Sequence, residues 1–193
     1  PYRVSSSCGA HYFLTLVDDM SRGVWLYLMK EKGEAGSHLR NFIALVKNQF
    51  NKRVKVIRTD NGTEFNSRPM QAFYQEKGIT HQTSCVATPQ QNGRVEHKHR
   101  HILNVARVLR FQASLPLDFW GECALTAAYL INRTPSKLLG GKTPYEIICQ
   151  IKPSYEHIKV FGSLCYAKTK GGDKFASRSR RCVFVGYPYG KKA

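Results

Sequence analysis

The sequence is poor in acidic residues, since 13 Asp and Glu stand against 30 Lys and Arg. It also lacks long apolar runs, and none approaches the roughly 18 consecutive residues that a membrane-spanning helix needs. No stretch has the layout of a secretory leader, and no internal repeat is visible. These absences argue against a membrane protein and predict a soluble chain without a targeting segment of its own.

Paired cysteine motifs are missing as well. The cysteines have no C-x-x-C spacing, which does not favour zinc ligation, and a disulfide framework is typical of smaller secreted domains. His97 and His101 stand four residues apart, as in some zinc-binding helices, but H-E-x-x-H and a third ligand are absent. We therefore expect free thiols in a reducing compartment at all six positions, which are Cys8, Cys85, Cys123, Cys149, Cys165 and Cys182.

Positive charge is what the sequence has in excess. The net charge is +17 and the isoelectric point is about 9.8. A basic domain of this size predicts a polyanionic partner, with nucleic acid as the first candidate. A membrane surface is the weaker alternative, because the Lys and Arg residues are dispersed rather than gathered on one amphipathic helix. The charge is densest in residues 151–193, which hold 10 basic and 2 acidic residues.

The length and the apolar content bound the architecture. A chain of 193 residues that is 42% hydrophobic can form one full domain and a small appendage. It opens on Pro1-Tyr2-Arg3 without a methionine, which predicts a piece of a longer polypeptide.

The hydrophobic pattern predicts an α/β order of elements. Apolar runs at 12–18 and 24–29 predict an antiparallel hairpin, and Thr143-Pro-Tyr-Glu146 predicts a capping box that begins a short helix. Helices are expected over 37–50, 66–77, 94–111 and 118–132, with strands over 54–59 and 79–84. This order predicts a mixed sheet flanked by helices. After Pro153 the predicted secondary structure changes, because residues 158–167 and 181–187 are rich in residues that favour β-strands.

Two acids occupy positions that suit a metal site. Asp60 ends a predicted strand, and Asn61-Gly62 after it predicts a tight turn with left-handed backbone. Glu96 stands at the start of the long helix over 94–111. Each has a simpler interpretation, Asp60 as an ordinary turn residue and Glu96 as a solvated helix-start carboxylate. Carboxylates on neighbouring elements are, however, the ligands that Mg²⁺ requires.

The residues around both acids carry a specific resemblance. The stretches Arg58-Thr-Asp-Asn-Gly-Thr-Glu-Phe65 and Thr88-Pro-Gln-Gln-Asn-Gly-Arg-Val-Glu96-His-Lys resemble the second and third acidic motifs of the integrase catalytic core of copia-type LTR retrotransposons, a family within the retroviral integrase superfamily. The resemblance implies a ribonuclease-H-like mixed sheet flanked by helices over residues 1–150. It also implies part of a small basic β-barrel over residues 151–193.

The same resemblance implies a catalytic site. Three acids in this family hold two Mg²⁺ (or Mn²⁺) ions for attack on a phosphodiester. By position, Asp60 is the second acid and Glu96 the third, whereas the first is expected just upstream of Pro1. The chain alone is therefore expected to bind metal weakly and to join no DNA. Glu64 is expected to support the ligands, and Asp18 is either a similar supporting residue or, with Asp19, a structural turn residue that pairs with Arg22.

Basic residues complete the expected site. Asn92 and Arg100 stand four residues before and after Glu96, and the resemblance assigns them to DNA contact, while Lys98 is expected to bind phosphate or to lie on a solvated helix face. In the tail, the expected DNA-contacting residues are Lys170, Lys174, Arg178, Arg180 and Arg181. The implied partners are retrotransposon ends, target DNA and further copies of the chain. The implied location is a cytoplasmic particle and the nucleus.

Two other functions fit the same residues. A metal-dependent nuclease of the same fold would cleave DNA without joining it. A non-catalytic module for DNA binding or assembly would need only the basic surface.

Overall fold

The hairpin predicted near the N-terminus is present. In the computed structural model, which describes residues 1–84, 93–168 and 177–187, β1 (Tyr12–Val17) pairs antiparallel with β2 (Val24–Met29) in the register Tyr12↔Met29 to Val17↔Val24. On β2, Val24 and Leu26 lie on one face and are buried in one core cluster, whereas Met29 lies on the other face and is buried in a second cluster. β2 therefore packs both of its faces against core residues.

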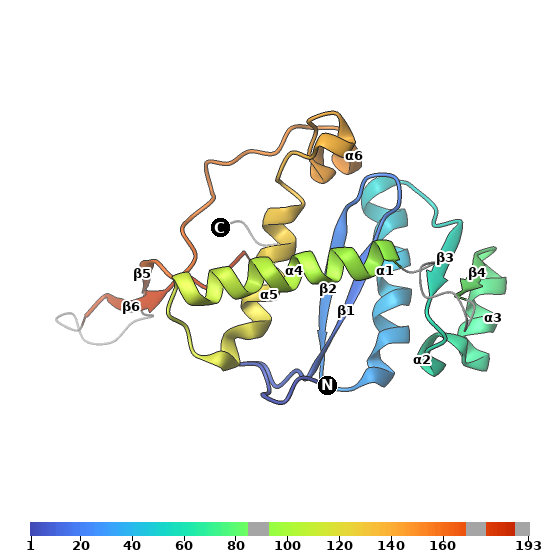
Figure 1. The fold of residues 1–193 in the computed structure, drawn as a ribbon, viewed down its shortest axis with the longest axis horizontal. Coiled ribbons are helices and arrows are strands. Elements are labelled where there is room, and N and C mark those ends of the chain that lie inside the picture. Colours follow the sequence, from blue (N-terminus) through green and yellow to red (C-terminus); the bar gives the residue numbers. More distant parts are fainter. Residues whose placement is uncertain (85–92, 169–176, 188–193) are drawn as a thin grey trace.

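A second layer lies beside the hairpin (Figure 1). After a 3₁₀ turn, η1 (Lys32–Glu34), helix α1 (Ala35–Phe50) leads to β3 (Val56–Thr59), which pairs in parallel with β4 (Thr80–Thr83). These elements enclose a core cluster made of Met29, Ala35, Leu39, Phe65, Met70, Tyr74 and Ile79.

The connection from β3 to β4 differs from the single helix expected over 66–77. It consists of a short α2 (Thr63–Asn66) and a separate α3 (Arg68–Lys77), with Ser67 between them in an extended conformation. Pro69 is the physical reason, because it lies in the first turn of α3, where it lacks an N–H and would clash with a preceding helical turn.

The long helix α4 (Gly93–Gln112) crosses the molecule and packs on α5 (Trp120–Ile131), which follows the 3₁₀ turn η3 (Leu117–Phe119). Small residues on α5 allow this close approach, since Ala124 and Ala127 are almost fully buried against the α4 stripe. The members of this second cluster are Val24, Leu26, Ile102, Ala106, Leu109, Cys123, Ala124, Ala127, Ala128, Ile131 and Phe161.

The strands form three separate ladders. Within the described residues no ladder joins β1 to β3, and β5 (Leu164–Lys168) pairs antiparallel with β6 (Ser179–Val183) as a hairpin that projects from the body (Figure 1). After residue 150 the described segments hold this two-stranded hairpin, and the predicted β-barrel and its boundary at residue 150 stay predictions. Phe161, which lies beyond that boundary, is buried in the α4–α5 cluster.

Between α5 and β5 lie η4 (Lys137–Leu139) and α6 (Pro144–Cys149). The predicted capping box is confirmed, because the Thr143 hydroxyl accepts a hydrogen bond from the backbone N–H of Glu146 while the Glu146 carboxylate accepts one from Thr143. Among the described residues, no helix is long and apolar enough to cross a membrane.

Candidate active site

Asp60 follows β3 directly, as predicted, and its side chain shapes the next turn. Asp60 Oδ1 accepts a hydrogen bond from the Gly62 N–H at 3.2 Å. The predicted left-handed turn is wrong: Gly62 has φ −57° and serves as the N-cap of α2, because the chain enters this helix at once. A Cβ at Gly62 would lie 2.9 Å from Glu64 Cδ and 3.0 Å from Asp60 Oδ1, so glycine lets both carboxylates approach this position.

The carboxylates of Asp60 and Glu64 therefore flank the same point beside Gly62. Asp60 is exposed and Glu64 is half-buried in the first turn of α2. Neither carboxylate forms an ion pair with any side chain in the described segments. Both keep acceptor oxygens available for a hard cation.

A hydrogen-bond chain fixes the backbone at Asp60. The Thr59 hydroxyl donates to the Asp60 carbonyl at 2.8 Å and lies 2.9 Å from His81 Nε2. Because the hydroxyl donates to the carbonyl, it accepts from His81, so His81 carries its proton on Nε2. Gln71 Nε2 lies 3.1 Å from His81 Nδ1 and completes the chain. Burial lowers the pKa of His81, which favours the neutral ring that this arrangement needs.

A cavity of about 710 Å³ connects these acids with α4. Asp60 and Glu64 line it together with Val95 and His99 of α4. His99 stacks on Phe13 of β1, with ring centroids 4.6 Å apart, and burial lowers its pKa. Glu96 is exposed in the first turn of α4, directly after Val95. The fold thus brings the first turn of α4 and the end of β3 to one cavity.

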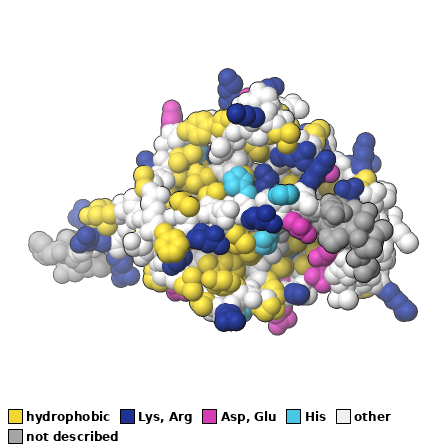
Figure 2. Space-filling model, viewed as in Figure 1, with side chains coloured by type: hydrophobic (Ala, Val, Ile, Leu, Met, Phe, Trp, Pro, Cys, Tyr) yellow, Lys and Arg dark blue, Asp and Glu magenta, His cyan; other side chains and the backbone are white. Residues whose placement is uncertain are grey.

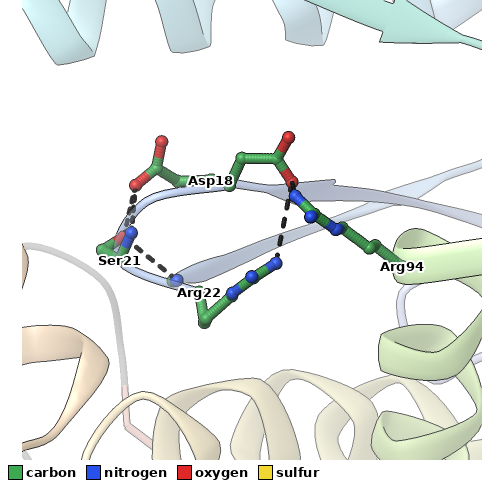
Figure 3. Close-up of polar contacts among 6 residues, drawn as sticks. Asp18, Ser21, Arg22 and Arg94 are labelled. Carbon is green, nitrogen blue, oxygen red and sulfur yellow. Dashed lines mark hydrogen bonds and ion pairs between the residues drawn. The ribbon is translucent and has the colours of Figure 1, made fainter. Parts of the chain in front are cut away.

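Asp18 has a separate role. Its Oδ2 atom accepts hydrogen bonds from the Ser21 N–H at 2.8 Å and from the Ser21 hydroxyl at 2.5 Å, so it caps the β1–β2 turn (Figure 3). Asp19 pairs with Arg22 at 3.8 Å, as predicted, and also with Arg94 of α4 at 3.0 Å. Asp18 is not among the residues that line the cavity beside Asp60.

The donor set fits a divalent ion by its chemistry, because Asp60, Glu64 and Glu96 are unpaired carboxylates. Among the described residues, no three His, Cys, Asp or Glu side chains are grouped closely enough to hold a metal ion.

Comparison with known proteins identifies the family. Residues 2–89 match the model of the integrase core domain. Over 189 residues, or 97% of the chain, the sequence is 37% identical to a retrovirus-related Pol polyprotein from transposon TNT 1-94 of Nicotiana tabacum. The chain belongs to the integrase core domain family. The resemblance inferred from the two acidic motifs is thereby confirmed.

A further relative is the Pol polyprotein from transposon RE1 of Arabidopsis thaliana, which is 36% identical over 91% of the chain. The chain spans only 14% of the tobacco polyprotein and 12% of the Arabidopsis one. It therefore corresponds to one segment of these larger proteins.

Solved structures confirm the fold class of this integrase core. A structure of the HTLV-2 integrase catalytic core domain in complex with magnesium, in a trimeric form, has a TM-score of 0.54 and 23% identity, covering 70% of this chain and 83% of that one. The catalytic core domain of BIV integrase has a TM-score of 0.53 and 24% identity, covering 72% and 85%. At these identities the likeness shows the ribonuclease-H-like fold.

The other predicted site residues of the integrase core are spread over two regions. On α4, Arg100 is exposed and Lys98 is half-buried. Arg178, Arg180 and Arg181 are exposed on or beside β6. None of the three lines the cavity beside Asp60. Three predicted DNA-contacting residues lie outside the described residues: Asn92, Lys170 and Lys174.

Sequence reasoning missed His81, which contacts Thr59 beside Asp60, and His99, which lines the same cavity as Asp60 and Glu64. The sequence carried only a partial signal for His81. It lies on β4 with its side chain on the opposite face from Thr80 and Gln82, and β4 runs parallel to β3, which ends just before Asp60. The spacing of three residues between Glu96 and His99 places both on neighbouring positions of one helix. Their partners, Thr59 and Phe13, are distant in the sequence.

Proposed function

We propose that this chain is the catalytic core of a DNA-integrating enzyme that joins retrotransposon cDNA ends to target DNA by polynucleotidyl transfer. The observation that carries the proposal is the cavity that Asp60 and Glu64 share with α4, from Val95 to Phe111. Glu96 follows Val95 directly and does not itself line this cavity. Family membership supports the reaction class. DNA as the partner is further supported by the net charge of +17.

Asp60 and Glu96 are the proposed metal ligands, with Mg²⁺ or Mn²⁺ as the ion. When bound, paired divalent ions activate the attacking oxygen and stabilise the leaving oxygen of a phosphodiester. The chain's own contribution is to hold the carboxylates. The Thr59–His81 contact fixes the Asp60 backbone, and the Gly62 N–H orients the Asp60 carboxylate. Glu64, close beside Asp60, is the proposed supporting acid.

A third carboxylate is needed by the family pattern, and β1 offers a place for it. Only the β2 side of β1 is paired within the described residues. The Tyr2 N–H donates to the His11 carbonyl at 2.7 Å, which begins an antiparallel pairing at the base of β1. An extended segment that continued this pairing along β1 would enter the cavity beside Asp60. We propose that the first acid lies on such a segment and that the 193-residue chain alone is inactive.

The test is a joining assay with labelled duplexes that carry retrotransposon-end sequences, in Mg²⁺ and in Mn²⁺. The 193-residue chain is compared with a version extended at its N-terminus by about ten residues, taken from the tobacco relative upstream of the matched region. We expect the extended protein to join the duplexes and the 193-residue chain not to join them. In the extended protein, Asp60→Asn and Glu96→Gln should each abolish joining. Glu76→Gln, which changes an exposed side chain of α3, should preserve it. Joining by either active-site variant would refute the ligand assignment.

A non-catalytic DNA-binding module is the second candidate, favoured by the basic charge and by the exposed arginines of β6. Tight DNA binding without joining by the extended protein would support it. Cleavage of the duplexes without joining would instead identify a nuclease of the same fold.

A further inference from the structure

A second cavity, of about 610 Å³, lies against a different face of α4 from the one that lines the acidic cavity. Its walls are the β1–β2 turn, α4 and the segment from Ile131 to Pro144. No Asp or Glu side chain lines it within the described segments. Its basic and histidine side chains are Arg22, Arg94, His97, Lys98, His101 and Lys137.

The β1–β2 turn holds Arg22 in place. Its N–H donates to the Asp18 carbonyl at 2.9 Å, and its backbone is left-handed, with φ 60°. A residue other than glycine adopts this conformation at a cost, which the capped turn offsets. The Arg22 side chain is only 24% exposed. The turn therefore presents a guanidinium at the cavity wall rather than in bulk water.

Lys98 faces Arg22 from α4. Lys98 is half-buried and forms no ion pair with any described residue. Burial and, to a smaller extent, the Arg22 charge lower the pKa of Lys98. A partly buried cation beside a second cation is unfavourable unless an anion compensates it. Within the part of the chain that the structure describes, this charge has no protein partner.

Asp19 compensates only part of the positive charge. Its Oδ1 atom lies 3.0 Å from an Arg94 nitrogen and 3.8 Å from an Arg22 nitrogen, and its side chain is 60% exposed (Figure 3). One carboxylate therefore serves two arginines at the rim. Lys98 and Lys137 have no ion-pair partner among the described residues, and the Ser136 hydroxyl adds a hydrogen-bond donor to the wall.

We propose that this cavity binds phosphates of the DNA backbone, which makes it a phosphate pocket (Arg22, Arg94, Lys98, Lys137) separate from the carboxylates. The choice of DNA rests on the proposed function, whereas the anionic character rests on the pocket alone. Arg94 and Lys98 stand two residues before and after Glu96, and positions two residues apart point to different sides of a helix, so the pocket and the exposed acid occupy different faces of α4. Figure 2 shows Lys, Arg and His side chains gathered beside acidic ones on this face.

Protonation is coupled to occupancy of the phosphate pocket. His101 lines it, and burial together with the Lys98 charge lowers the pKa of His101. A bound phosphate opposes the repulsion from Arg22, Arg94, Lys98 and Lys137 and favours the protonated imidazole of His101. Binding is therefore expected to take up protons and to strengthen as the pH falls from about 8 to about 6.

The experiment is a fluorescence-anisotropy titration of the 193-residue chain with a 20-base-pair duplex at several salt concentrations. Lys98→Gln should weaken binding about fivefold to tenfold and reduce the slope of log K against log salt by about one. Lys98→Arg should restore most of the affinity. Lys47→Ala, which removes an exposed charge of the same sign on α1, is the control for non-specific electrostatics. Circular dichroism checks that each variant is folded.

The possible outcomes separate the pocket from the proposed function. Equal losses in Lys98→Gln and Lys47→Ala would overturn the pocket. Calorimetric binding of inorganic pyrophosphate that Lys98→Gln abolishes, with duplex binding unchanged, would keep an anion site and overturn DNA as its occupant. Glu76→Gln should leave duplex binding intact, because Glu76 is exposed on α3 and does not line the pocket. A Lys98→Gln defect in a protein that never joins DNA would keep the pocket and reject the enzyme.

Discussion

Thr59 Oγ1 and His81 Nε2 lie 2.9 Å apart across the parallel β3–β4 pair, one residue before the candidate ligand Asp60. Gln71 reaches the other ring nitrogen at 3.1 Å, and the Tyr74 ring packs on the imidazole with centroids 4.6 Å apart. The ring is thus fixed on three sides. It links the stability of the α3–β4 layer to the position of the acid.

This contact predicts the pH dependence of stability. The pKa of His81 is lowered from 6.5 by burial, so the unfolded state binds a proton at a higher pH than the folded state does. The free energy of unfolding should therefore fall as the pH drops below about 6.5. Urea denaturation between pH 5 and pH 8 (roughly the range of histidine titration) measures it.

The His81→Gln variant isolates the contribution of this ring. It should show a shallower loss of stability at low pH than the wild type, although His99 and His101, whose pKa values are also lowered by burial, keep part of the slope. Identical slopes in the variant and the wild type would show that His81 titrates alike in both states.

A substitution at Gly62 should weaken metal binding with little loss of stability. In Gly62→Ala, the new Cβ would meet Glu64 Cδ at 2.9 Å and Asp60 Oδ1 at 3.0 Å, so the flexible carboxylates must move apart. Because these carboxylates are proposed to hold or support the metal, we expect about tenfold weaker Mn²⁺ binding with a stability loss under about 1 kcal/mol. Isothermal titration calorimetry measures the affinity.

Gly78 provides the matched control. It ends α3 with φ +64° and has open space around its Cα, so Gly78→Ala is strained only in its backbone. It should cost about 1 kcal/mol of stability and leave Mn²⁺ affinity unchanged. Weakened metal binding in Gly78→Ala as well would mean that Gly62→Ala acts through general destabilisation.

The sequence predicted those elements whose signal is local. The alternation in the β1–β2 hairpin and the capping box at Thr143 and Glu146 depend on neighbours within a few residues. Asp60 and Glu96 were found because each lies in a short recognisable motif. The helix break at Ser67 was missed because the apolar period continues across it, although Pro69 forbids one continuous helix.

Contacts between distant residues could not be predicted. The stacking of His99 on Phe13 and the packing of Lys98 near Arg22 join residues more than 75 positions apart. Periodicity assigns a residue to a helix face, yet it does not say which strand or turn lies opposite. The sequence therefore did not predict the phosphate pocket, because the pocket depends on the packing of the β1–β2 turn beside α4.

The last prediction concerns the C-terminal segment, which the sequence separated from the core at residue 150. Phe161 is only 6% exposed and belongs to the α4–α5 cluster, and Gly162 beside it would clash with Ala113 if it carried a Cβ. Phe161→Ala should therefore destabilise the whole chain by about 3–5 kcal/mol, as expected for a buried phenylalanine. Tyr166→Ala is the control, because Tyr166 on β5 is 63% exposed and should cost under about 1 kcal/mol. Guanidinium denaturation followed by the fluorescence of the partly buried Trp25 and Trp120 measures both. If Phe161→Ala left this transition unchanged, the segment after residue 150 would fold as an independent unit, and the predicted domain boundary would stand.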